Sequence, residues 1–323
     1  MYYTVNHVTR FRYDTPITES VMEVRIQPRS DGYQRCLDFR LSTSPKAPIL
    51  SYRDYLGNRV HHFDIPNLHN HLAVTAEAMV EVVAEPLLLE ALESDAWDRL
   101  DAMNANDKYW DMLKTSHFVR SSELLDDFIR EMDIRRLADP LITLREISRL
   151  IYEHFRYAKQ KTRVDSPIDD ALRIRRGVCQ DFAHIMLALA RELQIPCRYV
   201  SGYLFQQSAK NERSTHGATH AWVEALLPDI GWVGFDPTNN TLVTDRHIRV
   251  AVGRDYADVP PTRGTFRGCA ESELSVTVRV LPAELSSVSD ELSLEADWVT
   301  VLNEGYEREE GSPWQHAQEQ QQQ

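Results

Sequence analysis

The chain has 323 residues, of which 42% are hydrophobic and 26% are charged, as is typical of a soluble globular protein with about two domains. A chain of this length buries a hydrophobic core without needing disulfides. Its net charge of −13 predicts that it repels nucleic acid and anionic membranes, so neither is an expected partner.

Residues 1–85 have the alternation of β-strands. Polar and apolar residues alternate over 23–27 and over the Val- and Ala-rich stretch 72–83, and Asp-Tyr-Leu-Gly-Asn at 54–58 has the composition of a turn. The segment predicts a small antiparallel β-sandwich. The start of the chain lacks the basic and apolar stretches of a secretory signal, and no apolar run approaches the roughly 20 residues of a membrane span. The sequence therefore predicts a cytoplasmic protein.

Residues 86–157 have a helical pattern. Apolar residues recur every three to four positions between 124 and 132, and again between 144 and 155. Ser121 or Ser122 is an expected helix cap, and Thr143 is another. This helical segment leads into the part of the chain that carries the candidate chemistry.

Residues 158–283 are predicted to form a catalytic core. A polar loop over 158–178 precedes a helix whose apolar face runs from Phe182 to Leu193 and which ends before Pro196.

Strands should follow this helix. They are expected at residues 198–205, 220–226, 232–235 and 273–280, with a turn over 228–231. The remaining segment, 284–323, ends in a glutamine-rich stretch that is expected to be disordered.

Cys179 stands at the predicted start of the core helix. Unpaired N–H groups at a helix N-terminus carry partial positive charge and favour the thiolate, which is the reactive form of cysteine. One of these N–H groups could also donate to a developing oxyanion. The alternative interpretation is a buried structural cysteine, which is what we expect of the other three cysteines.

His220 and Asp236 are the candidate partners of Cys179. A thiolate nucleophile needs a base, and the base needs a group that orients it. Taken singly, His220 is an ordinary histidine at a strand edge and Asp236 is an ordinary turn residue. A hairpin of two short strands would nevertheless bring the end of the Asp236 strand close to the start of the His220 strand, within reach of a cross-strand contact.

Several sequence blocks carry a resemblance to a known family. They are Gly-Val-Cys-Gln-Asp-Phe-Ala at 177–183, Arg-Glu-Leu-Gln-Ile-Pro-Cys-Arg-Tyr-Val-Ser-Gly at 191–202, Thr-His-Ala-Trp-Val-Glu at 219–224 and Phe-Asp-Pro-Thr at 235–238. With the order Cys, His, Asp, they resemble the transglutaminase-like superfamily in its bacterial cysteine-peptidase-like branch. Residues 1–85 resemble the β domain that accompanies this core in bacteria, whereas 86–140 and 285–323 match no motif.

The resemblance implies an α+β fold with a papain-like core, in which a cysteine-bearing helix packs on an antiparallel sheet that carries the histidine and the aspartate. Cys179 would attack an amide carbonyl to form an acyl-enzyme thioester, His220 would move the proton, and Asp236 would orient His220. The implied function is a cysteine peptidase or amidase with peptide or protein substrates. No cofactor is expected, and nothing requires the calcium that animal transglutaminases use.

Two alternatives to hydrolysis remain open. An amine instead of water could resolve the acyl-enzyme, which is transglutaminase chemistry, or the core could serve a non-catalytic binding or scaffold protein. Hydrolysis is favoured because water is always present and because the bacterial branch is described as protease-like.

Four further residues are candidates for the substrate cleft. Gln180 and Asp181 follow Cys179 on the helix, Trp222 shares a strand face with His220, and Tyr157 could donate to an oxyanion. Their ordinary explanations are local hydrogen bonds for the polar residues and core packing for the aromatic ones.

A zinc site is a further alternative. His216 and His220 are four residues apart, and His184 and Cys197 lie nearby in sequence. Four-residue spacing brings two ligands together on a helix, whereas His220 is expected on a strand, so the sequence predicts no metal.

Overall fold

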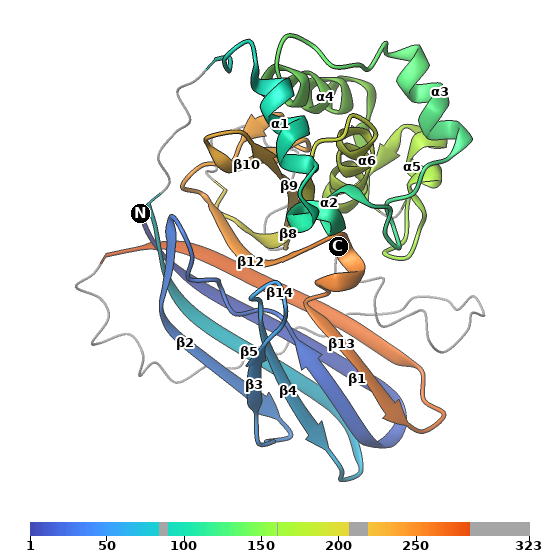
Figure 1. Ribbon diagram of the computed structural model, residues 1–323. Coiled ribbons are helices and arrows are strands. Elements are labelled where there is room, and N and C mark those ends of the chain that lie inside the picture. The colour runs from blue at the N-terminus through green and yellow to red at the C-terminus, as the bar shows by residue number, and fades with distance from the viewer. Residues whose placement is uncertain (84–89, 160, 207–218, 285–323) are drawn as a thin grey trace.

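The computed structural model describes residues 1–83, 90–159, 161–206 and 219–284 (Figure 1). A long curled β-sheet forms one end of the molecule, and a core of helices packed on a second sheet forms the other. This arrangement confirms the predicted α+β class with an N-terminal β region. His216 and the glutamine-rich end of the chain lie outside the described residues.

The β domain is a seven-stranded antiparallel sheet organised around one very long strand. Its strands are β1 (Tyr2–Val24), β2 (Gln34–Ser44), β3 (Leu50–Arg53), β4 (Arg59–Ile65), β5 (His69–Val82), β13 (Thr262–Arg267) and β14 (Ser272–Ala283). The first half of β1 pairs with β5 and β14, and its second half pairs with β4 and β13. Because buried residues alternate along β1, the two halves enclose one apolar cluster that includes Phe11, Val24 and Phe63.

The structure differs from the sequence-based boundary at the C-terminal side of the core. The strand expected at 273–280 exists within β14, yet β14 and β13 hydrogen-bond to β1. The predicted core range 158–283 therefore includes two strands of the β domain. Alternation predicts that a strand exists but does not identify its partner, and here the partner lies at the opposite end of the chain.

The helices precede the core sheet. They are α1 (Ala96–Asn104), the 3₁₀ turn η1 (Asp107–Tyr109), α2 (Trp110–Leu113), α3 (Glu123–Glu131), α4 (Pro140–His154), α5 (Ile168–Ile174) and α6 (Cys179–Glu192). Even α4, with its 15 residues, falls short of a membrane span, and no other helix in the described ranges is long and apolar enough to cross a bilayer.

Two of these helices have side-chain caps. Ser122 caps α3 as expected, since its hydroxyl accepts a hydrogen bond from the N–H of Leu125. At α4 the cap is Asp139, the residue before Pro140, and its carboxylate accepts from the backbone N–H groups of Leu141 and Ile142. Thr143 is not the cap, because it lies inside α4 and donates its hydroxyl to the Asp139 carbonyl.

The core sheet is antiparallel and carries α6 across its centre. Its strands are β8 (Cys197–Leu204), β9 (His220–Leu227), β10 (Gly231–Asp236), β11 (Thr241–Leu242) and β12 (His247–Gly253), in the order β11-β10-β9-β8-β12. The short strands β6 (Arg156–Tyr157) and β7 (Arg176–Gly177) pair in parallel ahead of α6, and the 3₁₀ turn η2 (Tyr256–Asp258) follows β12. The expected strands at 198–205, 220–226 and 232–235 correspond to β8, β9 and β10.

Two side-chain amides of the β domain bond to the backbone of β12, which lies between the two parts of the molecule (Figure 1). The amide of Asn58 donates to the carbonyl of Val252 and accepts from its N–H, both at 2.8 Å. The amide of Gln34 does the same for Arg249, at 2.8 and 2.7 Å. Asp54 shapes the turn that presents Asn58, so the motif at 54–58 is an interface element.

Candidate active site

Cys179 is the first residue of α6, and the residues around it shape the start of this helix. The carboxylate of Asp181 accepts hydrogen bonds from the N–H of Val178 at 2.8 Å and from the hydroxyl of Thr162 at 2.6 Å. A Cβ atom at Gly177 would lie only 2.6 Å from this carboxylate, so glycine is required there. Burial raises the pKa of Asp181 to about 6, while the two hydrogen bonds act in the opposite direction.

Asp181 and Gln180 are therefore structural residues of the helix start. Asp181 lies in the first turn of α6 and reaches back to accept the N–H of the N-cap residue Val178. The Gln180 side-chain amide donates to the Val164 carbonyl at 2.8 Å and so holds the loop before α5. Neither residue is among those that line the cavity beside Cys179, which differs from the cleft role expected for them.

A small cavity adjoins Cys179. It is lined by Cys179, Tyr199, Ser201, Thr219, His220, Ala221, Tyr256 and Pro261. Apart from Cys179 and His220 this lining consists of hydroxyl-bearing and apolar side chains. The structure thus brings the predicted nucleophile and the predicted base to the same small space.

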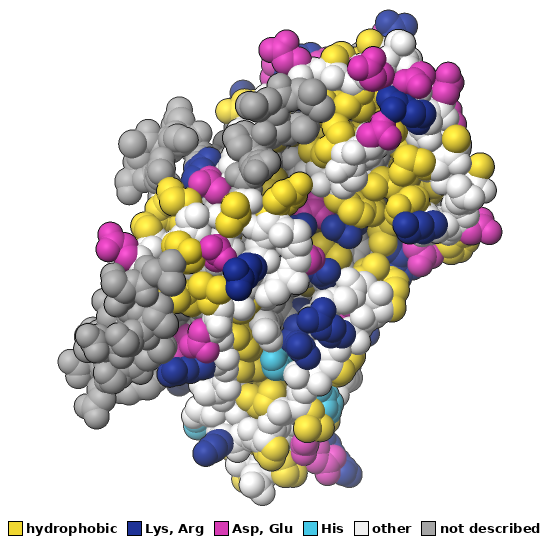
Figure 2. Space-filling view, turned by 60° about the vertical axis from the view of Figure 1, so that its left-hand side comes forward, with side chains coloured by type: hydrophobic (Ala, Val, Ile, Leu, Met, Phe, Trp, Pro, Cys, Tyr) yellow, Lys and Arg dark blue, Asp and Glu magenta, His cyan; other side chains and the backbone are white. Residues whose placement is uncertain are grey.

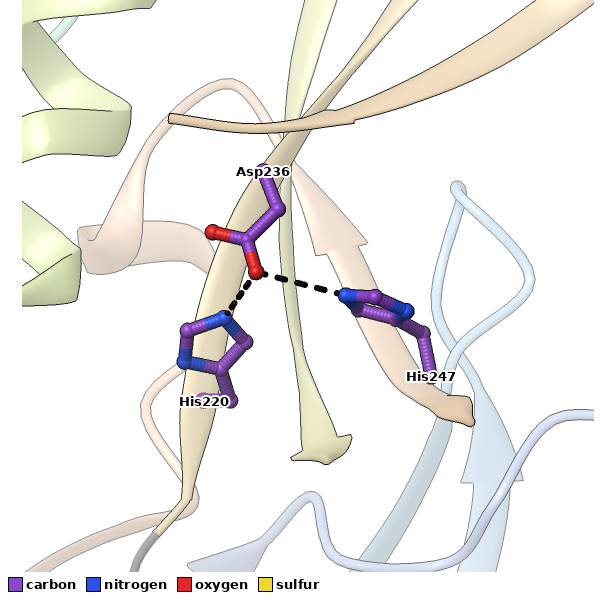
Figure 3. Close-up of side chains that lie close together, drawn as sticks. All are labelled: His220, Asp236 and His247. Carbon is purple, nitrogen blue, oxygen red and sulfur yellow. Dashed lines mark hydrogen bonds and ion pairs between the residues drawn. The ribbon is translucent and has the colours of Figure 1, made fainter. Parts of the chain in front are cut away.

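His220 and Asp236 form a buried pair. His220 begins β9 and Asp236 ends β10. The pairing of Phe235 with Val223 places the two side chains diagonally across neighbouring strands. The Nε2 atom of His220 lies 2.8 Å from the Oδ2 atom of Asp236 (Figure 3). Nδ1 of His220 has no hydrogen-bond partner among the described residues, and is thus the ring nitrogen available to the Cys179 thiol.

The electrostatics of the pair favour an imidazolium facing a carboxylate. Burial by itself would lower the pKa of His220, but the charge and hydrogen bond of Asp236, together with the nearby Cys179 sulfur, raise it to about 10. Burial would likewise raise the pKa of Asp236, yet the His220 charge and the hydrogen bonds from His220 and His247 hold it well below its usual range.

Asp236 is fully buried and accepts several hydrogen bonds. Its Oδ1 atom accepts from the backbone N–H groups of Thr238 at 3.0 Å and Asn239 at 3.4 Å, so it also has the turn role that its sequence position suggested. Its Oδ2 atom accepts from His220, from the Asn239 amide at 2.7 Å and from Nε2 of His247 at 3.3 Å. These donors fix the carboxylate and compensate for its burial.

His247, the first residue of β12, is the site residue that sequence reasoning missed. It lies on the opposite side of Asp236 from His220 (Figure 3). No local motif marks it, because its neighbours in sequence form an ordinary turn and its partner Asp236 is reached only after the chain has crossed to the far edge of the sheet. A second histidine shortly after an Asp-containing hairpin was the only available signal.

His220, Asp236 and His247 are also the described group whose side-chain atoms lie near enough to hold a metal ion, within 4.8 Å of one another. A metal would need the Nε2 lone pair of His247. However, the Thr244 N–H lies 3.2 Å from Nδ1 of His247 and donates to it, so the ring proton of neutral His247 is on Nε2, where Asp236 accepts it. This network favours a hydrogen-bonded triad over a metal centre.

The zinc ligands considered from the sequence do not form a group in the described part of the chain. His184 accepts the Tyr256 N–H through Nε2 at 3.2 Å, and the Cys197 thiol lies against the Leu187 carbonyl. Burial is the main cause that lowers the pKa of His184, to about 3. His184 is therefore a neutral core histidine.

Trp222 covers the His–Asp pair and does not line the cavity. Its fully buried ring lies 5.3 Å from the His247 ring and 6.1 Å from the His220 ring, measured between centroids. The ring passes over Gly202, where a Cβ would come within 2.5 Å of it. Trp222 thus excludes water from the ionic pair. Tyr157 packs near Phe182, with ring centroids 6.4 Å apart, and is likewise not part of the cavity lining.

Family models match both parts of the molecule. The bacterial transglutaminase-like N-terminal region matches residues 3–81, and the transglutaminase-like superfamily model matches residues 131–237. A solved structure of a proposed cysteine protease from Cytophaga hutchinsonii superposes with a TM-score of 0.67 at 21% identity, covering 88% of this chain and 92% of that one. That likeness shows the fold, including the β domain.

Similar sequences come from several bacteria. An uncharacterized protein of Mycobacterium leprae is 34% identical over 277 residues, covering 85% of this chain and 97% of that protein. One from Mycobacterium tuberculosis is 32% identical over 300 residues, covering 87% and 93%. A protein-glutamine gamma-glutamyltransferase of Pseudomonas aeruginosa is 34% identical over 132 residues, covering 38% of this chain and 20% of that enzyme. With both regions matched and relatives aligned over nearly their whole length, the chain belongs to the transglutaminase-like superfamily.

Proposed function

We propose that the chain is a cysteine-nucleophile enzyme that cleaves amide bonds through Cys179, His220 and Asp236. The observation that carries the proposal is the buried His220–Asp236 pair, whose free ring nitrogen belongs to a residue lining the same cavity as Cys179. A nucleophile, a base and an orienting carboxylate are the parts that acyl transfer needs.

The first half of the reaction forms the acyl-enzyme. The Cys179 thiolate adds to the amide carbonyl, and a backbone N–H at the start of α6 stabilises the oxyanion. The C–N bond then breaks, the leaving amine takes the proton from His220, and a thioester remains on Cys179. Asp236, held ionised by its donors, keeps the imidazole oriented and stabilises its charged form.

The second half resolves the thioester. Water gives a proton to His220 and attacks the carbonyl, after which the carboxylic acid leaves and the thiolate–imidazolium pair is restored. Peptides or proteins are the proposed substrates. On the face shown in Figure 2 acidic and basic side chains are interspersed, and with the net charge of −13 this supports a substrate other than nucleic acid. The cytoplasmic location stays a prediction.

The second candidate is transfer of the acyl group to an amine. It is favoured by the similarity between 38% of this chain and the protein-glutamine gamma-glutamyltransferase of Pseudomonas aeruginosa. The chemistry up to the thioester is the same, so the acceptor alone separates the two candidates. A non-catalytic scaffold is disfavoured because it has no need of a buried, fully bonded carboxylate beside an imidazole.

The test incubates the protein with unfolded casein and a glutamine-containing peptide, with and without a labelled primary amine, followed by mass spectrometry. Hydrolysis predicts new peptide termini or glutamate in place of glutamine, whereas transfer predicts the labelled amine on glutamine. Both products should vanish in Cys179→Ala and persist in Cys269→Ser, which changes an exposed cysteine. Activity that survives in Cys179→Ala would exclude this mechanism.

A further inference from the structure

We propose that His247 is a positioning residue that holds the Asp236 carboxylate against His220 and thereby moderates the basicity of His220. This inference rests on the proposed function, since it assigns His247 a role in the same site. His247 touches neither the cavity nor Cys179 among the contacts described, so it acts on the reaction only through Asp236.

The tautomer of His247 is set by the backbone. The Thr244 N–H donates to Nδ1 at 3.2 Å, while the His247 N–H returns a hydrogen bond to the Thr244 carbonyl at 3.1 Å. A ring nitrogen that accepts cannot carry the proton of a neutral imidazole, so Nε2 carries it and points at Oδ2 of Asp236, 3.3 Å away. Burial lowers the pKa of His247 and thus keeps it a neutral donor.

Oδ2 of Asp236 is thereby placed between two imidazoles with different tasks. His220 needs the carboxylate as a charge partner, and every further donor on the same oxygen withdraws part of that charge. The His247 N–H therefore limits how strongly Asp236 holds the proton on His220, which must leave for the amine during catalysis. The charges of His220 and Arg246 also oppose protonation of the His247 ring.

The surroundings restrict movement of the His247 ring. Its ring centroid lies 5.3 Å from that of Trp222 with an interplanar angle of 75°, and its side chain is about 1% exposed. It begins the strand that Gln34 and Asn58 hold from the β domain. A buried ring fixed by an aromatic neighbour and by the backbone can hold a hydrogen bond to a precise point, as positioning requires.

The test compares His247→Leu with His247→Gln, whose amide nitrogen can replace Nε2 as a donor. The readout is the rate of Cys179 alkylation by iodoacetamide as a function of pH, which needs no knowledge of the substrate. His247→Leu should change this rate by roughly tenfold at neutral pH and shift its pH profile, as expected for loss of one hydrogen bond to a charged group. In His247→Gln the rate of Cys179 alkylation should stay within about threefold of that of the unaltered protein.

Val250→Ala is the matched control, because Val250 is buried on the same strand and its apolar side chain cannot donate a hydrogen bond to Asp236. It should lower the melting temperature and leave the pH profile unchanged. If His247→Leu and Val250→Ala have the same profile, or if a folded His247→Gln behaves like His247→Leu, the positioning role is wrong.

A second measurement covers the case in which His247→Leu does not fold. Nitrogen NMR of the histidine rings in the unaltered protein should show His247 protonated at Nε2 and bare at Nδ1 from about pH 6 to 8. Protonation at Nδ1 instead would overturn the inference. The proposed function fails separately, if Cys179 of the unaltered protein shows no reactivity above that of an unactivated thiol.

Discussion

Gly202 of β8 lies directly opposite His220 of β9 in the pairing of these strands. The ring of Trp222 occupies the space that a side chain at Gly202 would fill, and the Ile248 carbonyl would lie 2.2 Å from such a Cβ. The absence of a side chain at Gly202 is thus what allows Trp222 to cover the His–Asp pair.

Gly202→Ala should therefore destabilise the protein by about 1–3 kcal/mol, as overpacking in a rigid core does. Urea unfolding measures this change. The double variant Gly202→Ala/Trp222→Ala should lose less unfolding free energy than the sum of the two single variants, because removing the Trp222 ring relieves one of the two clashes. Strict additivity of the two changes would contradict the proposed close packing.

Iodoacetamide should label Cys179 much faster than Cys36 and Cys197 in a Cys269→Ser background. Burial raises the pKa of Cys36 to about 11 and also raises that of Cys197, so both remain thiols at neutral pH. Because His220, whose pKa is raised to about 10, lines the same cavity as Cys179 and offers it a positive charge, the Cys179 rate should exceed the rates of Cys36 and Cys197 from about pH 7 to 9.

Peptide mapping after timed alkylation gives the rate at each cysteine, and His220→Ala is the control that removes the ion-pair partner. Equal labelling of the three cysteines would argue that Cys179 is a structural residue.

Asp236→Asn should reduce kcat/KM by roughly a hundredfold or more. The amide cannot accept from His220 on one side and from the N–H groups of Thr238 and Asn239 on the other, so one set of donors loses its partner. The measurement is the activity identified in the casein and peptide assay, together with the melting temperature. Asn239→Ala, which removes a single donor to Asp236, should have a smaller effect on both quantities.

His7 should make the protein sensitive to acid. Its Nδ1 atom lies 2.9 Å from the Tyr203 hydroxyl and its Nε2 atom 3.1 Å from the Thr9 hydroxyl, and burial lowers its pKa from 6.5 to about 4. The unfolded chain therefore binds a proton at a higher pH than the folded protein does. The resulting stability is fully present above about pH 6.5 and is lost as the pH falls toward 4, by about 3 kcal/mol in all.

Urea unfolding near pH 7.5 and near pH 4.5 tests this expectation. His7→Gln should weaken the dependence on pH, whereas the same change at exposed His71 should leave it as it is. An unchanged slope in His7→Gln would mean that other buried histidines account for the acid sensitivity.

The local parts of the fold were predictable, and the non-local ones were not. The start of α6 at Cys179 and the strands around His220 and Asp236 follow from short-range patterns, and a hairpin brings its own two ends together. The sharing of β1 by β13 and β14 and the approach of His247 to Asp236 depend on how distant segments cross in space. The roles of Asp181 and Trp222 could not be assigned for the same reason, because the residues that line the cavity come from distant parts of the chain.

The amides of Gln34 and Asn58 have a consequence for the solubility of the core. β12 is the last strand of its sheet, and an open strand edge is a template for another chain. Because side chains occupy the outward N–H and C=O groups of Arg249 and Val252, no further strand can add there. A fragment without the β domain would expose this edge, and we expect it to self-associate through β12.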